Sequence, residues 1–96
     1  MIKSFASQSS ADIYHGHQTR DARKIPQDIW NTACRKLDLL NSVLNLNDLR
    51  VPPANRLQLL KGKVSGKYSI RINDQWRVVF EFREGNAFEV DIVDYH

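Results

Sequence analysis

The stretch that decides the fold is YSIRINDQWRVVFEFREGNAFEVDIVDYH, from Tyr68 to His96. Apolar side chains recur at alternate positions through most of it, which is the period of a strand that buries one face. Short turns at Asn73–Gln75 and Glu84–Asn86 interrupt the alternation, and connections this short join antiparallel neighbours. The stretch therefore predicts three consecutive strands of an antiparallel meander.

The residues before this stretch carry the period of a helix. A helix is predicted from Pro26, because a proline at the first helical position lacks an N–H that would have no partner there. Its apolar stripe, which should pack on the sheet, comprises Ile29, Ala33, Leu37, Leu40 and Leu44. Pro52–Pro53 forbids further helix. Leu57–Leu60 is expected to supply one more strand before a loop at Gly62–Gly66.

The N-terminal part is expected to add an edge strand and a short helix. Ile2–Phe5 is apolar at alternate positions, a short helix should begin around Ser9 and stop at Gly16, and the polar residues 16–24 are expected to form a mobile loop. Helices followed by a meander predict an α+β class. We therefore expect one domain over residues 1–96, with two N-terminal helices packed on one face of a compact antiparallel sheet.

Composition narrows the possible functions without choosing one. The chain has 96 residues, and its 14 Lys and Arg against 11 Asp and Glu give a formal charge of +3. This excess suits an RNA, DNA or ribosome partner, and equally an ordinary solvated surface. The single cysteine, Cys34, excludes an internal disulfide. No apolar run is long enough to span a bilayer and the start lacks the features of a signal peptide, so a soluble cytoplasmic protein is expected.

The alternation also sorts the arginines of the predicted sheet. If Trp76 and Phe80 face the helix, Arg71 and Arg77 lie on the opposite, open face, with Lys61 at its margin. Clustered cations on an open sheet face suit a phosphate backbone. Solvent-facing charge on a half-buried sheet is the simpler interpretation of the pattern alone. In either case a side chain on the open face should contribute little to packing.

The last three residues combine groups that exchange protons. Asp94, Tyr95 and His96 bring a carboxylate, a phenol and an imidazole to the end of a predicted strand. A histidine in that place is commonly a frayed, exposed residue. His15 and His17 invite a metal interpretation, but further ligands at a recognisable spacing are missing, so no metal is expected.

Three segments resemble the HigB family, which belongs to the RelE/ParE superfamily of toxin–antitoxin toxins. They are LRVPPANRLQLLKG (Leu49–Gly62), YSIRINDQWRVVF (Tyr68–Phe80) and VDIVDYH (Val90–His96). The resemblance extends from the opening MIKSF through the long predicted helix, and it is weakest between Ala6 and Lys24. The ordered run of these motifs is specific, unlike any one short motif alone.

The resemblance implies a RelE-like sheet with two helices on one face and a concave RNA-binding surface on the other. It implies a metal-independent, ribosome-dependent endoribonuclease that cuts mRNA, needs no cofactor, and inhibits translation and growth. It also implies a HigA-like helix-turn-helix antitoxin as partner, with operator DNA bound only through the toxin–antitoxin complex.

The resemblance also assigns roles to residues. Arg77, in the Trp-Arg position, would stabilise the charge that builds on the phosphate, and Lys61, in the Leu-Lys-Gly position, would add to it. Asp94, Tyr95 and His96 match the family's terminal trio, in which His96 or Asp94 would move protons.

Three further residues, Arg71, Gln58 and Arg56, are expected to contact RNA. Gln58 stands where some family members have a histidine, and a neutral amide is no general base near pH 7. Either His96 or Asp94 takes that role, or the enzyme is slow, or the ribosome supplies the missing groups.

Two other functions share this fold class. A ParE-like toxin acts on DNA gyrase without cutting RNA, and the terminal trio together with the Trp-Arg pair argues against it. An inactive module would serve only in antitoxin binding and promoter regulation, and Gln58 keeps that alternative open.

Overall fold

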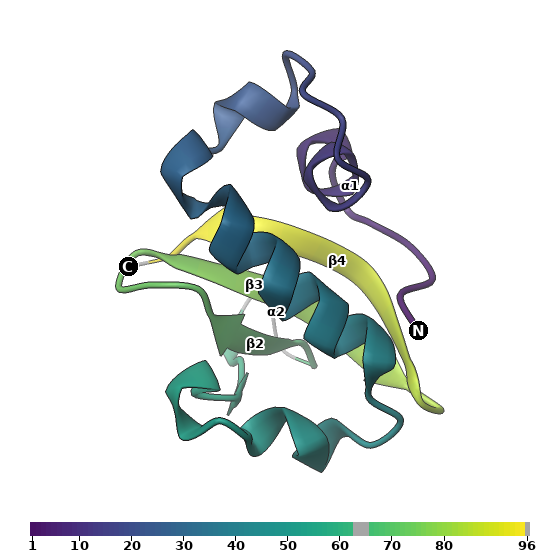
Figure 1. Ribbon diagram of the computed structural model, residues 1–96. Helices are drawn as coiled ribbons and strands as arrows, with labels where there is room; N and C mark the ends of the chain where they lie inside the picture. The colour runs from purple at the N-terminus through teal and green to yellow at the C-terminus, as the bar shows by residue number, and fades with distance from the viewer. Residues whose placement is uncertain (63–65, 96) are drawn as a thin grey trace.

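The computed structural model describes residues 1–62 and 66–95. Four antiparallel strands form one sheet in the order β1-β2-β3-β4, and the long helix α2 crosses one face of it (Figure 1). The strands are β1 (Gln58–Leu59), β2 (Tyr68–Arg71), β3 (Trp76–Arg83) and β4 (Asn86–Asp94). The helices are α1 (Gln8–Tyr14) and α2 (Trp30–Ser42), with short 3₁₀ turns η1 (Ala22–Lys24), η2 (Gln27–Ile29), η3 (Leu46–Arg50) and η4 (Pro53–Asn55). The predicted α+β architecture is confirmed.

The meander has the register that the alternation predicts. Ile70 pairs with Val78, which pairs in turn with Ile92, and all three side chains are buried on the α2 face. Between Val79 and Glu81 the β3–β4 register shifts because β4 carries one extra residue there. A bulge of this kind increases the local twist of the ribbon.

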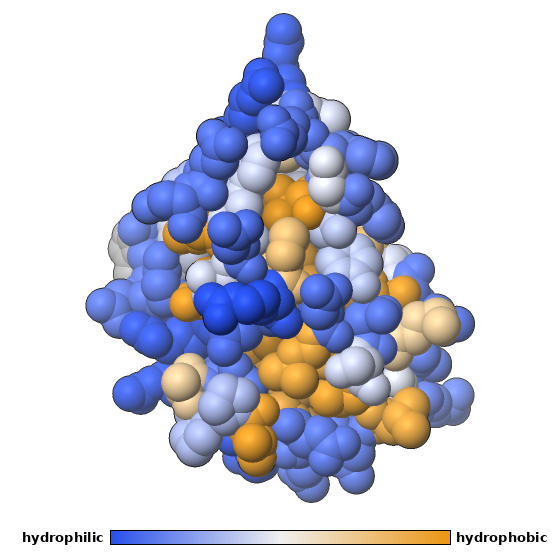
Figure 2. Space-filling model, in the orientation of Figure 1, coloured by the Kyte–Doolittle hydropathy of each residue, from blue (hydrophilic) through white to orange (hydrophobic). Residues whose placement is uncertain are grey.

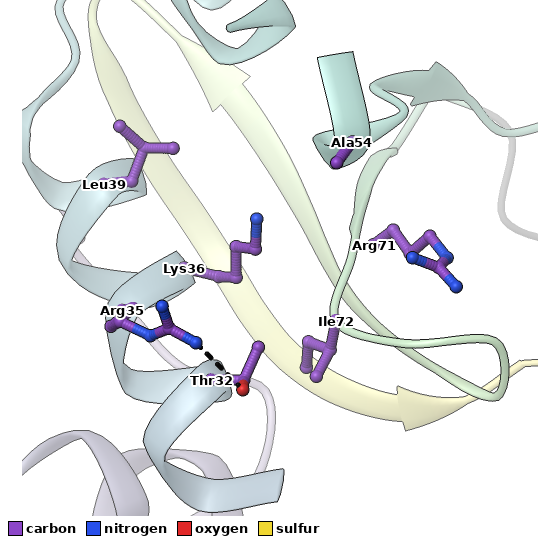
Figure 3. A pocket seen from close by; sticks show the side chains of 7 residues that line it. All are labelled: Thr32, Arg35, Lys36, Leu39, Ala54, Arg71 and Ile72. Carbon is purple, nitrogen blue, oxygen red and sulfur yellow. Dashed lines mark hydrogen bonds between the residues drawn. The ribbon is translucent and has the colours of Figure 1, made fainter. Parts of the chain in front are cut away.

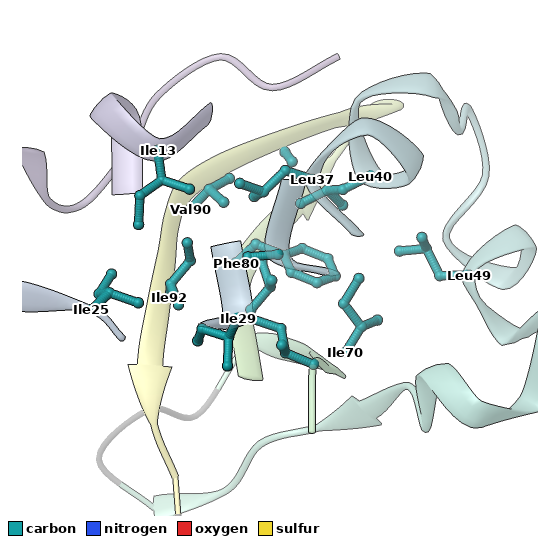
Figure 4. Packing of buried hydrophobic residues seen from close by; sticks show 14 of the residues in the cluster. Ile13, Ile25, Ile29, Leu37, Leu40, Leu49, Ile70, Phe80, Val90 and Ile92 are labelled. Atoms are coloured by element: carbon teal, nitrogen blue, oxygen red, sulfur yellow. The ribbon is translucent and has the colours of Figure 1, made fainter. Parts of the chain in front are cut away.

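The stripe of α2 packs on this sheet as expected, with one exception. Leu37 and Leu40 are fully buried against Phe80 (Figure 4). Leu44, which the stripe includes, is 81% exposed. The helix ends at Ser42, and the extended backbone at Val43 buries that side chain instead. The helix also begins later than Pro26, because the residues directly after the proline form η2.

The N-terminal segment is tied to β4. Ile2 and Phe5 make isolated parallel bridges to Ala87 and Val90, so the expected edge strand is reduced to two bridges. The short helix α1 begins one residue before the predicted Ser9, because the Ser7 hydroxyl caps it.

The predicted loop 16–24 is more ordered than its composition suggests. It contains η1, and Ala22 within it is fully buried. The Thr19 hydroxyl donates to the Asp12 carboxylate at 2.5 Å, and this bond together with one from Gln8 holds the pKa of Asp12 below its ordinary value. The segment predicted as a loop thus contains a short 3₁₀ turn, and a buried carboxylate on α1 binds it.

The segment between α2 and the sheet is organised around one buried amide. Asn55 is fully buried and donates through Nδ2 to the carbonyls of Leu49 at 3.1 Å and Val51 at 3.3 Å. Its Oδ1 accepts from the ammonium of Lys36 on α2. The η3–η4 segment is thereby held against α2, which fixes the residues that follow it.

Hydrophilic side chains frame the α2 face, and hydrophobic ones are visible between them over its middle (Figure 2). Among the residues that the structure describes, no helix is both long enough and apolar enough to cross a membrane.

The contrast between two leucines of the stripe gives a test of the fold. Leu37→Ala should lower the free energy of unfolding by about 2–5 kcal/mol, because it leaves a cavity beneath α2. Leu44→Ala should change it by no more than about 0.5 kcal/mol, since that side chain is exposed. Urea denaturation measures both values. Equal losses would contradict the placement of the helix end.

Candidate functional site

Arg77 lies at the centre of the face that points away from α2. It sits on β3 directly opposite Arg71 of β2, as the parity of the strands predicts. The side chain is nevertheless only 8% exposed. Its Nε donates to the Ser69 hydroxyl at 2.8 Å, and its Nη2 donates to the Arg56 carbonyl at 2.6 Å. The expectation of an open, weakly packed side chain is wrong, because a loop and the C-terminal segment cover this part of the sheet.

Arg56 enters the site through its backbone. It adopts a left-handed conformation, with φ 45° and ψ 55°, directly after η4. For a residue other than glycine this costs roughly 1–2 kcal/mol, and the bond from Arg77 to the Arg56 carbonyl offsets part of the cost. The Arg56 side chain itself is exposed. The sequence identified Arg56 as a contact for RNA, but not as the residue that fixes Arg77.

Tyr95 approaches Arg77 just beyond the end of β4, whereas Asp94 pairs in register with Trp76. The Cζ atom of Arg77 lies 5.9 Å from the centre of the Tyr95 ring, within the range of a cation–π contact. Gln75 holds this segment in place: its carbonyl accepts from the Tyr95 N–H at 2.6 Å, and its Nε2 donates to Asp94 Oδ2 at 3.0 Å. Sequence reasoning missed Gln75, although its turn lies beside the end of the neighbouring strand.

The electrostatic environment of Arg77 favours an anion. Burial lowers the pKa of its guanidinium, the Tyr95 phenol opposes this shift, and the nearby cations Arg71 and Arg56 lower the pKa further. A guanidinium stays charged under all ordinary conditions. The arrangement therefore concentrates positive charge at a partly desolvated point, where a phosphate would be bound more strongly than in water.

Arg71 connects this site to a cationic cleft at the edge of α2 (Figure 3). The cleft has a volume of about 280 Å³ and is lined by Thr32, Arg35, Lys36, Leu39, Ala54, Arg71 and Ile72. Burial lowers the pKa of Lys36, and the charges of Arg35 and Arg71 lower it further. Arg71 also forms an ion pair with Asp74. The predicted Arg71 thus has two cationic neighbours that the strand pattern did not reveal.

The remaining predicted residues lie farther out. Gln58 is exposed on β1 and pairs in register with Ser69, so it shares the face that carries Arg77. Lys61 is exposed just beyond β1, and no contact among the described residues joins it to Arg77. His96 lies outside the described residues.

A second cleft, of about 300 Å³, lies on the same face beside Tyr95. It is lined by Ala6, Leu60, Lys67, Val79, Asp91, Val93, Asp94 and Tyr95. In the part of the chain that the structure describes, no three His, Cys, Asp or Glu side chains converge as a metal site would require. His15 and His17 lie with their ring centres 6.0 Å apart, and Nδ1 of His17 is 3.9 Å from the Asp12 carboxylate.

Comparison with known proteins places this site in a family. The model of the HigB-like toxins, described as the RelE-like toxin of the type II toxin–antitoxin system HigB, matches residues 3–96. The chain therefore belongs to the HigB family of RelE-like toxins.

Curated relatives agree with this assignment. Toxin HigB-1 of Vibrio cholerae is 43% identical over 65 residues, which is 68% of each chain. Endoribonuclease HigB of Proteus vulgaris is 28% identical over 96 residues and covers 100% of both chains. An uncharacterized protein of Haemophilus influenzae is 40% identical over 85 residues, which is 88% of this chain and 83% of that one.

Solved structures share the fold. A chain of the YoeB–YefM complex from Staphylococcus aureus superposes with a TM-score of 0.54 over 100% of this chain and 98% of that chain, at 18% identity. A second structure, described as a heterotetrameric YoeB–YefM toxin–antitoxin complex from the same organism, matches equally well. At this identity the likeness extends to the fold alone.

The burial of Arg77 predicts that it stabilises the protein. Arg77→Ala should lower the free energy of unfolding by about 1–3 kcal/mol, because the Ser69 hydroxyl and the Arg56 carbonyl lose their donor. The exposed Arg23→Ala serves as the control, with a change within about 0.5 kcal/mol. Thermal or urea denaturation measures the difference. Two indistinguishable variants would mean that the guanidinium makes no net contribution.

Proposed function

We propose that this protein is an endoribonuclease that cuts mRNA on the ribosome and thereby arrests growth. Two facts support the activity: the chain belongs to a toxin family, and a relative that matches over its whole length is named an endoribonuclease. The observation that carries the proposal is the guanidinium of Arg77, buried, fixed by Ser69 and the Arg56 carbonyl, and placed beside Tyr95.

The chemistry of metal-free RNA cleavage matches these groups. The ribose 2′-OH attacks the adjacent phosphorus, the bond to the 5′-oxygen breaks, and a 2′,3′-cyclic phosphate and a 5′-OH result. The step needs a base for the 2′-OH, cations for the growing charge on the phosphate, and an acid for the leaving oxygen. Arg77 supplies the cation in a fixed position. Arg71, directly opposite it on β2, contacts the phosphate backbone of the RNA.

The geometry of Arg77 suits charge that develops in the transition state. A guanidinium has five N–H donors, and two of them are used by Ser69 and Arg56. The remaining donors are held in a plane whose orientation those two bonds set. Fixed donors need little reorganisation when charge appears, which is the main source of electrostatic catalysis.

Proton transfer is assigned to the C-terminal segment. Gln58 is a neutral amide and takes no part as a base. We assign His96 and Asp94 to this role and Lys61 to the margin of the phosphate site, on the strength of the family motifs. Asp94 is oriented by the Gln75 amide, and Tyr95 lies over the Arg77 guanidinium.

The proposed partner is a HigA-like helix-turn-helix antitoxin, and operator DNA is bound through that complex. The helical side of the chain offers basic side chains to an acidic partner: Arg20, Arg23, Lys24, Arg35 and Lys36. The ribosome and mRNA are the other partners, which places the protein in the cytoplasm. A ParE-like action on gyrase and a purely regulatory role are the alternatives that the next experiments separate.

Two variants test the cleavage chemistry. Arg77→Lys keeps a positive charge but loses the forked donors, and it should slow ribosome-dependent mRNA cleavage about 10²–10³-fold. Deletion of His96 should slow it about 10²–10⁴-fold, the usual contribution of acid–base catalysis. Arg83→Lys, an exposed position on the same strand, should cut normally. Ends of mRNA are mapped on programmed ribosomes, and melting curves confirm that each variant is folded.

Each outcome separates the candidate functions. Normal cleavage by the folded variant lacking His96 would remove the proton-transfer role from that residue. Normal cleavage by Arg77→Lys would move the active site away from the sheet face. Growth arrest without any new mRNA ends would favour a gyrase poison.

The partner is tested by co-expression. A small helix-turn-helix protein encoded next to this chain should co-purify with it and restore growth. The physical reason is that a basic toxin surface gains electrostatic complementarity when a specific partner covers it. A chain that purifies alone, with host growth undiminished, would count against the whole proposal.

A further inference from the structure

The cleft beside Tyr95 differs in chemistry from the cationic cleft at α2. Apolar side chains of Leu60, Val79 and Val93 line much of it. Asp91 and Asp94 are the acidic residues of its lining, and Lys67 is the basic one. Negative side chains repel a phosphate, and apolar walls offer it no hydrogen bonds. A flat, uncharged ring with polar edges fits such a cleft better than any part of the RNA backbone does.

Asp91 is held in one orientation by α1. The hydroxyls of Ser7 and Ser10 donate to Asp91 Oδ1 at 2.7 Å and 2.9 Å. Ser10 is fully buried, and its hydroxyl oxygen accepts from the backbone N–H of Ile92 at 2.8 Å. Both serine bonds end on the same carboxylate oxygen, so Oδ2 is the atom through which Asp91 accepts a further donor.

We propose that this cleft, the base cleft, binds a nucleobase of the RNA next to the phosphate held by Arg77, and that Asp91 reads the edge of that base. The inference rests on the proposed nuclease function and adds its specificity. Tyr95 links the two places, because it lines the base cleft and its ring lies 5.9 Å from the Arg77 guanidinium carbon. The cleft volume of about 300 Å³ is large enough for one base, but not for the adjacent bases of the RNA as well.

The carboxylate dictates which base is preferred. An ionised carboxylate accepts hydrogen bonds and donates none. At the edge that faces the major groove of a duplex, adenine and cytosine present an amino group, where guanine and uracil present a carbonyl oxygen. If Asp91 meets this edge, as we propose, it favours adenine or cytosine and repels the carbonyl of the other two bases.

Replacement of one oxygen by an amide tests this assignment. In Asp91→Asn the two serine hydroxyls still donate to an oxygen, so the amide oxygen takes the place of Oδ1. The NH₂ group then occupies the place of Oδ2 and turns an acceptor into a donor. The preference should reverse from adenine and cytosine to guanine and uracil. A carboxylate that only anchors α1 to β4 would give no such reversal.

The experiment uses ribosomes programmed with short messages that differ at one nucleotide beside the cut. At one of the positions beside the cut, the base should decide the rate. The unchanged protein should cut messages that carry adenine or cytosine there roughly 5- to 150-fold faster than messages that carry guanine or uracil. Asp91→Asn should invert that ratio. Glu89→Gln, which removes a charge from an exposed position of β4, should leave it unchanged.

The possible outcomes are distinct. Absence of cleavage by the unchanged protein would overturn the nuclease function itself, and with it the base cleft. Cleavage whose base preference is the same in Asp91→Asn and the unchanged protein would overturn only the base cleft. If Asp91→Asn does not fold, Val93→Phe serves as the test, because the larger side chain fills the cleft from a partly buried position. A folded Val93→Phe protein should cut every message at least 10-fold more slowly. Normal cleavage by that variant would refute the proposal.

Discussion

The buried guanidinium of Arg77 is the constraint on which the functional face depends. A charge that is withdrawn from water destabilises the fold unless fixed partners surround it. Here those partners come from three places: the Ser69 hydroxyl on β2, the Arg56 carbonyl in the loop after η4, and the ring of Tyr95 after β4. The loop and the C-terminal segment are therefore positioned by the charge that they enclose, and a ligand anion meets a site that is already assembled.

Buried polar groups beside β2 and beside β4 support this arrangement. Asn55 accepts from Lys36 and donates to two loop carbonyls, so α2 fixes the segment that carries Arg56. At β4, Ser10 accepts from the backbone and donates to Asp91, so α1 fixes the cleft wall. Neither residue touches the proposed phosphate position. Their role is to hold the residues that do, as second-layer contacts commonly hold a preorganised site.

The sequence predicted the sheet and its faces because both follow from local periodicity. Alternation placed Ile70 and Val78 in the core and Arg77 opposite them, as the register confirms. Periodicity could not predict the burial of Arg77, since the two groups that cover it, Arg56 and Tyr95, are 21 and 18 residues away along the chain. The residue type at position 56 does not indicate the left-handed backbone found there, because arginine normally favours the right-handed region. The family motifs assigned functional roles to residues, but not the contacts that position them.

The two ends of the functional face differ in charge, so an RNA strand can lie across it in only one direction. Arg35, Lys36 and Arg71 gather on the α2 side of Arg77, and the apolar, carboxylate-bearing cleft lies on the Tyr95 side. A phosphodiester chain gains from the first environment and loses in the second, whereas a base gains from the second. An RNA strand that satisfied both would run its backbone along the arginines and turn one base across Tyr95. That single orientation would bring the same bond to Arg77 each time, which is what cleavage at a defined position requires.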